Sequence, residues 1–345
     1  MEPSAKSRLN RLGTLNATVK ASASIPVPIS PPLVLSLTRP SILEAMVRTD
    51  SLAPSLANWL SEPGKGPVSA FLAFIKAEFR PKHNCLQYSS LAPNLPFMLY
   101  KYYMSVKLVA IDLDDTLLNP DLSISTENSM AVKAAMDAGV AVVLASGRTF
   151  FSMKPYADAL GLAEKDYPII CSNGAEIRHS TSGELIRHFT IPSQNGKIIV
   201  EELLSKGLAV QSYEDNWIIC TEPNSFTFLD SKLTGLMIKK AETIEELYSK
   251  PRSKFLSSGK PEYLSELAVI LKEKFAEIAE VVITKPYFLE VLPVGVDKGE
   301  ALAWLAGEMR IAQEEVMAIG DAQNDLGMVS WAGYGSAPSD AIPSV

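Results

Sequence analysis

The chain has 345 residues, of which 47% are hydrophobic and 21% are charged, and its formal net charge is −7. This length exceeds what one ordinary domain needs, and the composition excludes collagen, a coiled coil and a wholly disordered chain. The acidic balance also argues against a nucleic-acid-binding face, which would need clustered Lys and Arg.

Residues 1–103 differ in composition from the rest of the chain. Pro, Ser and Ala dominate, and residues 25–32 cannot propagate a helix or a sheet because proline lacks a backbone donor. No acidic residue lies between Glu2 and Glu44, which is typical of an organellar transit peptide. Two interpretations stay open: a plastid or mitochondrial transit peptide, or a disordered leader before a cytoplasmic protein that starts at Met104. In both, we expect this leader to lie outside the folded core.

From Val106 onward, short apolar runs alternate with amphipathic segments, which predicts a mostly parallel sheet covered on both faces. One helix is predicted to begin near Thr126, with Ser125 as its N-cap, and to end at Gly139. Four apolar runs are each followed by polar residues, which we expect to meet at the ligand-binding edge of the sheet. These runs are residues 108–111 before Asp112, 140–144 before Ser146, 167–171 before Ser172, and 316–319 before Gly320.

Residues 175–290 follow a different pattern, in which strands and helices do not alternate regularly. The candidate strands are 186–191, 208–213, 217–220 and 281–284, and the candidate helices are 194–206 and 262–275. We therefore predict an α+β cap domain inserted into an α/β core made of residues 104–174 and 291–345. Both crossings lie near the ligand-binding edge, where an insertion can act as a lid.

The strongest chemical signal is the acidic loop after the first core strand, which contains Asp112 and Asp114. Two unpaired anions in such a loop would be costly to bury, so they need a cation, and Mg²⁺ prefers oxygen ligands. A second acidic loop, with Asp321 and Asp325, follows the last apolar run and would complete a metal site. A lone acidic loop is commonly a turn or a helix cap, but two of them at one sheet edge favour chemistry.

The chain from about Val106 to Val345 resembles the haloacid dehalogenase superfamily, and within it the Cof-type phosphatases with a C2B cap. The family's four motifs occur in order as residues 112–116 (DLDDT), Ser146 in ASGR, Lys298 in DKG, and residues 320–325 (GDAQND). The resemblance implies a Rossmannoid core, phosphatase activity and Mg²⁺ as cofactor.

Related proteins continue beyond the equivalent of Val345 through a further strand and helix. We therefore expect an exposed sheet edge and lower stability.

By this resemblance, Asp112 attacks phosphorus to form an aspartyl-phosphate, and Asp114 protonates the leaving oxygen and then activates water. Mg²⁺ would be held by Asp112, by Asp321 and by the backbone carbonyl of Asp114. The remaining implied roles are phosphate binding by Ser146, Gly147, Lys298 and Asn324, positioning by Thr116 and Asp325, and substrate contact by Asn173 and Arg148. Two alternatives stay open: Arg148 pairs with a neighbouring carboxylate, and Asn173 is a turn residue.

A carboxyl group at position 114 favours phosphomonoester hydrolysis, because an alkoxide leaving group gains from protonation whereas a halide does not. We expect a Mg²⁺-dependent phosphatase of small esters such as sugar phosphates and nucleotide or cofactor precursors. We expect no nucleic-acid partner and no membrane span, since no apolar run approaches the roughly 18 to 20 residues that cross a bilayer.

The alternative functions are a phosphotransferase of the phosphomannomutase type and a catalytically impaired phospholigand-binding protein. In the cap, residues 213–217 are either leaving-group contacts or packing residues. The oligomeric state does not follow from the sequence.

Overall fold

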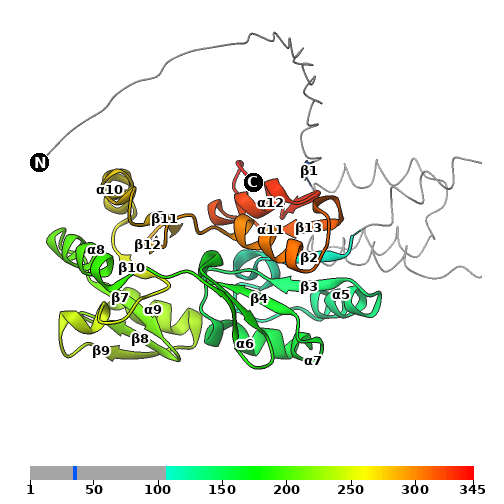
Figure 1. Cartoon of the computed structure of the whole chain (residues 1–345), viewed down its shortest axis with the longest axis horizontal. Coiled ribbons are helices and arrows are strands. Elements are labelled where there is room, and N and C mark those ends of the chain that lie inside the picture. The colour runs from blue at the N-terminus through cyan, green and yellow to red at the C-terminus, as the bar shows by residue number, and fades with distance from the viewer. Residues whose placement is uncertain (1–33, 37–105) are drawn as a thin grey trace, which may run out of the picture. The chain divides into compact units, whose positions relative to one another are not determined.

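A computed structural model describes residues 34–36 and 106–345 of the chain, which form an α/β core and an inserted cap (Figure 1). The first core segment contains β1 (Val34–Ser36), β2 (Leu108–Ile111), η1 (Leu113–Leu117), α5 (Thr126–Asp137), β3 (Ala141–Leu144), α6 (Phe150–Ala159), α7 (Leu162–Lys165), β4 (Pro168–Cys171) and η2 (Ser172–Gly174). The second contains α11 (Lys298–Glu308), η4 (Gln313–Glu315), β13 (Val316–Ile319), η5 (Gln323–Asp325), α12 (Leu326–Trp331) and β14 (Tyr334–Ala337).

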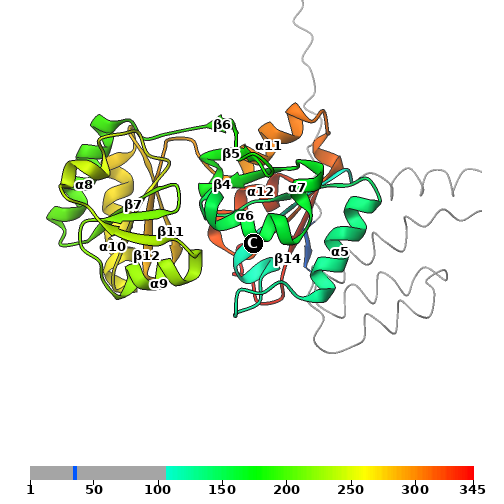
Figure 2. The ribbon, with the colours of Figure 1, turned by 90° about the horizontal axis from the view of Figure 1, so that it is seen from below.

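The core is a parallel sheet with the strand order β1-β14-β13-β2-β3. A parallel bridge between Ala145 and Ile170 continues this arrangement to β4. Every residue of β2, β3 and β13 is buried, because helices cover both faces of the sheet. Helices α5, α6 and α7 pack on one face, and α11 and α12 pack on the other (Figures 1 and 2). The expected α/β core with its parallel sheet is confirmed.

Strand β1 comes from the segment that the sequence analysis placed outside the core. Val34, Leu35 and Ser36 pair in parallel with Gly335, Ser336 and Ala337 of β14. The unpaired backbone groups along the edge of β14 need partners, and a short apolar segment can supply them. The remaining residues of the predicted leader, 1–33 and 37–103, lie outside the described part of the chain.

Helix α5 forms as its sequence predicts. The side chain of Ser125 accepts a hydrogen bond from the backbone amide of Asn128, which satisfies one of the free donors of the first turn. Gly139 follows the C-cap Ala138 and adopts a φ of 86°, a conformation that favours glycine. Both predicted ends are therefore confirmed.

The first crossing between core and cap contains a hairpin of β5 (Glu176–His179) and β6 (Leu185–His188). Strand β5 pairs with β4, so this hairpin extends β4 instead of joining the cap sheet. The predicted cap boundary at residue 175 therefore falls before a hairpin that belongs to the core by its strand pairing. At the other boundary, β12 (Phe288–Leu292) lies in the cap sheet beyond residue 290.

The cap proper is a six-stranded sheet with the order β11-β12-β10-β7-β8-β9. Its other elements are α8 (Ser193–Ser205), β7 (Val210–Glu214), β8 (Trp217–Cys220), α9 (Ser225–Thr234), β9 (Met237–Lys240), η3 (Ile244–Leu247), β10 (Phe255–Ser258), α10 (Pro261–Phe275) and β11 (Glu280–Lys285). Helices α8 and α10 cover one face, against Val210, Phe255 and Val291. The intervening residues belong to the opposite face, where Gln211, Leu256 and Glu290 lie in register. Among all described residues, no helix combines the length and apolar character needed to cross a membrane.

Gly299 lies where α11 approaches α12, and we expect its replacement to destabilise the core. A β-carbon at this position would lie 2.5 Å from the carbonyl carbon of Gly327. Gly299→Ala should therefore lower the free energy of unfolding by about 1–3 kcal/mol, the usual cost of overpacking, as measured by urea denaturation. Gly307→Ala in the same helix is the control, because nothing lies within 4 Å of its added β-carbon. Equal losses at both positions would contradict this account.

Candidate active site

Asp112 follows the central strand β2 directly and is only 4% exposed. Its backbone amide donates to the carbonyl of Ile319 at 2.9 Å, which ties the end of β2 to the end of β13. After Asp112 the chain leaves the sheet in a loop in which Asp115 has a φ of 61°. The parallel strands thus bring the two acidic loops of the sequence to one edge, as predicted.

A buried lysine joins these two loops. Lys298 is 0% exposed, and its Nζ donates to Oδ1 of Asp112 and to Oδ1 of Asp325, each at 2.6 Å. Burial alone would lower the pKa of Lys298, but the two carboxylates outweigh burial and raise it. Burial raises the pKa of the Asp112 carboxyl, and the charge of Lys298 opposes that rise. An ionised Asp112 therefore depends on the positive charge of Lys298.

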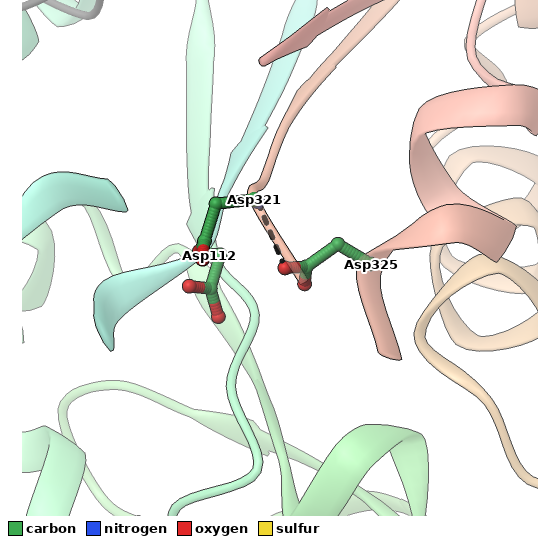
Figure 3. Close-up of side chains that lie close together, drawn as sticks. All are labelled: Asp112, Asp321 and Asp325. Carbon is green, nitrogen blue, oxygen red and sulfur yellow. Dashed lines mark hydrogen bonds between the residues drawn. The ribbon is translucent and has the colours of Figure 1, made fainter. Parts of the chain in front are cut away.

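Three carboxylates form a candidate metal site at this edge. Asp112, Asp321 and Asp325 each place a carboxylate oxygen within 4.8 Å of the others (Figure 3). Oδ2 of Asp325 accepts hydrogen bonds from the amides of Asp321 and Ala322 at 3.1 and 3.0 Å, so both of its oxygens have protein partners. Thr116 donates to Asp321 at 2.8 Å and orients it. Asp112 and Asp321 are thus freer than Asp325 to bind an ion.

Ser146 and Gly147 form the loop after β3. Ser146 is buried, its amide donates to the carbonyl of Ile170 at 2.9 Å, and its Oγ accepts from the amide of Arg148 at 3.2 Å. The hydroxyl proton of Ser146 is therefore available to a ligand. The carbonyl of Gly147 accepts a hydrogen bond from Lys254 of the cap at 2.8 Å.

Arg148 pairs with Asp114, which was one of its two predicted roles. Its Nε and Nη2 donate to the two oxygens of Asp114 at 2.8 and 2.6 Å. Its Nη1 donates to Ser152 at 3.1 Å and to the carbonyl of Leu233 in the cap at 2.5 Å. Burial would raise the pKa of the Asp114 carboxyl, but the hydrogen bonds and charge of Arg148 outweigh burial and lower it. The ionised form of Asp114 is therefore favoured in this structure.

Asn173 links core and cap inside the protein. It is buried with a φ of 57°, its Nδ2 donates to Glu290 at 2.9 Å, and its Oδ1 accepts from Asn324 at 2.9 Å. A cavity of about 660 Å³, counting the space open to solvent, lies beside these residues. Of the predicted site residues, Asp112, Asp114, Ser146, Gly147, Arg148, Asp321 and Asn324 line this cavity. Thr116, Asn173, Lys298 and Asp325 lie behind that wall and contact the residues that form it.

The cap residues that line the cavity were not predicted. They include Asp230 of α9, Lys254, Lys285 and Glu290, whereas residues 213–217 do not line it. Glu214 instead pairs with the exposed Lys250 and the buried Arg252, and Tyr213 donates to Asp230. A charged residue inside an apolar strand, such as Glu290 in the sequence Phe288–Leu292, is the signal that could have located this wall.

Comparisons with known proteins match this chain to one family and one fold. The family of haloacid dehalogenase-like hydrolases matches residues 109–345. A 5-amino-6-(5-phospho-D-ribitylamino)uracil phosphatase from Bacillus subtilis (strain 168) is 33% identical over 266 residues, covering 69% of this chain and 89% of the relative. A crystal structure of a haloacid dehalogenase-like hydrolase from Bacteroides thetaiotaomicron superposes with a TM-score of 0.64 and 29% identity, covering 69% of this chain and 90% of that chain. A crystal structure of a Thermotoga maritima protein superposes with a TM-score of 0.60 and 30% identity. The match covers 70% of this chain and 89% of that chain.

Lys298→Gln should destabilise the protein, because it leaves two buried carboxylates without a counter-charge. We expect a loss of about 3–5 kcal/mol in the free energy of unfolding at pH 8, measured by urea denaturation in EDTA. Without Lys298, burial acts on Asp112 without the charge that opposes it, so the pKa of this carboxyl rises further above its unfolded value. A raised carboxyl pKa gives stability that is lost as pH rises. The loss in K298Q should therefore be smaller at pH 5 than at pH 8. Lys133→Gln, on the surface of α5, is the control. A loss that does not depend on pH would count against the buried pairing.

Proposed function

The chain belongs to the haloacid dehalogenase-like hydrolases and is a phosphatase of that family, and we propose that it hydrolyses small phosphomonoesters with Mg²⁺ through an aspartyl-phosphate on Asp112. The observation that carries the proposal is the buried Lys298, which holds Asp112 and Asp325 beside the third carboxylate of the cluster, Asp321. The Bacillus subtilis relative is named for a phosphorylated ribitylaminouracil, which supports a small phosphomonoester as substrate.

The donor set of the site fits Mg²⁺, which prefers carboxylate, carbonyl and water oxygens. Asp112 and Asp321 would hold the ion, together with the backbone carbonyl of Asp114. Asp325 would not, because its two oxygens already bind Lys298 and two backbone amides. When bound, the ion supplies positive charge beside the transferring phosphoryl group.

In the proposed first step, an oxygen of Asp112 forms a bond to phosphorus while the bond from phosphorus to the ester oxygen breaks. Asp114 gives its proton to that oxygen, so the leaving group departs as an alcohol. The Ser146 hydroxyl and the Gly147 amide would donate to the phosphoryl oxygens, and Lys298 would offset their charge. Lys298 keeps its proton throughout, because its two carboxylate partners raise its pKa.

In the proposed second step, the ionised Asp114 takes a proton from water. The water oxygen then bonds to phosphorus and the bond to Asp112 breaks, which releases inorganic phosphate and restores both carboxyl groups. The contact with Arg148 favours the ionised form of Asp114 that this step requires. The first step requires the protonated form, so we infer that Arg148 releases Asp114 when the leaving group enters the cavity.

Asp112→Asn should abolish turnover, because an amide is not a nucleophile toward phosphorus. The measurement is phosphate release from a panel of small phosphomonoesters with Mg²⁺, with and without EDTA. We expect at least a 1000-fold loss in D112N, from removal of covalent catalysis, and a complete loss in EDTA. Asp137→Asn, an exposed carboxylate on α5, is the control and should retain full activity.

Other outcomes of this assay would support the alternative functions. Phosphate that appears on an added sugar or alcohol instead of free in solution would support a phosphotransferase. Ligand-dependent thermal stabilisation without turnover by the folded protein would support a phospholigand-binding protein. Undiminished activity in EDTA would contradict the metal assignment.

Arg148→Met should move the pH profile of the enzyme. Without Arg148, only the charges of Lys285 and Lys298 oppose burial at the Asp114 carboxyl, so its pKa rises. The alkaline limb of kcat/KM for an alkyl phosphate should then move to higher pH, because the first step needs protonated Asp114. Arg148→Lys keeps a positive charge and should move the limb less. A limb that stays in place, or moves to lower pH, would exclude Asp114 as the acid.

A further inference from the structure

The cap wall of the cavity contains four charged side chains, and three of them have partners of opposite charge. Lys254 donates to Glu290 at 2.9 Å and to the carbonyl of Gly147 at 2.8 Å. Lys285 pairs with Asp115 of the core. Among the described residues, the fourth group, Asp230, forms no ion pair.

Only one oxygen of the Asp230 carboxylate accepts hydrogen bonds from the described residues, and both donors are neutral. It is 5% exposed, and its Oδ2 accepts hydrogen bonds from Nε2 of Gln211 at 2.6 Å and from the hydroxyl of Tyr213 at 2.7 Å. Its Oδ1 accepts no hydrogen bond from any described residue. Burial of the side chain raises the pKa of Asp230. Oδ1 is not enclosed by the protein, because Asp230 lines the cavity. This oxygen is an acceptor that a ligand in the cavity can satisfy.

The position of Asp230 is fixed before any ligand binds. Helix α9 begins in a capping box at Asn224 and ends at Gly235, which has a φ of 73°. Thr234 donates its hydroxyl to the backbone carbonyl of Asp230 at 2.6 Å. With both ends of the helix capped and two donors on Oδ2, the carboxylate is preorganised, as recognition of a specific group requires.

The surroundings favour a neutral donor over a cationic one. On the cap wall, the positive charge of Lys254 acts on Asp230 as well as on Glu290, so it would repel a cationic ligand. The same wall carries the apolar side chains of Leu233, Leu256 and Phe288, which suit the carbon skeleton of a small metabolite. A carboxylate beside apolar surface is a suitable acceptor for the hydroxyl groups of a polyol or sugar.

We propose that Asp230 is a specificity-determining residue of the cap, which accepts a hydrogen bond from a hydroxyl group of a polyhydroxylated leaving group. This assignment rests on the phosphatase function proposed above and extends it to the substrate. Asp230 does not take part in the chemical step. Its effect is therefore on the choice between esters and not on the cleavage of phosphate as such.

Asp230→Asn tests the assignment, because it reverses the hydrogen-bonding character of the exposed atom. Gln211 and Tyr213 would hold the amide oxygen of the new side chain, so its NH₂ group would face the ligand in place of an acceptor. The probes are sorbitol 6-phosphate, whose leaving group carries several hydroxyls, and p-nitrophenyl phosphate, whose leaving group carries no donor. We expect kcat/KM of D230N to fall at least 10-fold for the first ester and to stay within 2-fold for the second.

Two further variants separate recognition from folding. Asp215→Asn, in the turn between β7 and β8 and outside the cavity, is the matched control and should leave both esters unchanged. Tyr213→Phe removes one donor from Oδ2 without altering the charge of Asp230, so KM for sorbitol 6-phosphate should rise while kcat for p-nitrophenyl phosphate is kept.

Equal losses of D230N on both esters, or no loss on either, would overturn the assignment. A preferential loss on phosphoethanolamine instead of sorbitol 6-phosphate would overturn the choice of a hydroxyl and identify an ammonium ligand. Failure of the folded wild-type protein to hydrolyse any of the three esters would refute the proposed function itself. That result differs from a selective failure of the Asp230 prediction, in which wild-type activity persists.

Discussion

The positive charge of the buried Lys298 offsets the two carboxylates around which the site is built. Asp112 and Asp325 end up beside each other because they follow two adjacent parallel strands, β2 and β13. Two carboxylates at such a distance inside a protein repel each other. Lys298 offsets this repulsion by donating a hydrogen bond to each, and it begins α11 on the face of the sheet opposite α5. Removing one member of such a buried pair is far more costly than never having formed it.

The cap is held over the core by cations that reach across the cavity. Lys254 and Lys285 extend from the cap to Gly147 and Asp115, and Arg148 extends from the core to Leu233. Each of these three cations pairs with a carboxylate: Lys254 with Glu290, Lys285 with Asp115, and Arg148 with Asp114. Because Arg148 binds both the cap backbone and Asp114, the position of the cap and the protonation of Asp114 are physically linked.

The sequence predicted the core more completely than the cap, for physical reasons. Parallel strands buried on both faces leave continuous apolar runs, and the polar residues after them could be assigned to one edge without coordinates. In the cap, each strand alternates between two faces, and the strand order that brings α9 beside β7 is not encoded locally. Residues 213–217 were therefore chosen as candidates while Asp230 was missed. The bidentate pairing of Arg148 with Asp114 depends on side-chain direction, which spacing alone does not give.

Two of the contacts between cap and core end on backbone carbonyl groups, those of Gly147 and Leu233. A carbonyl group is present whatever side chain the residue carries. Substitutions at position 233 can therefore reshape the wall of the cavity without removing the acceptor that Arg148 uses. The substrate preference of such a protein can therefore change during evolution while the backbone contacts between cap and core are kept.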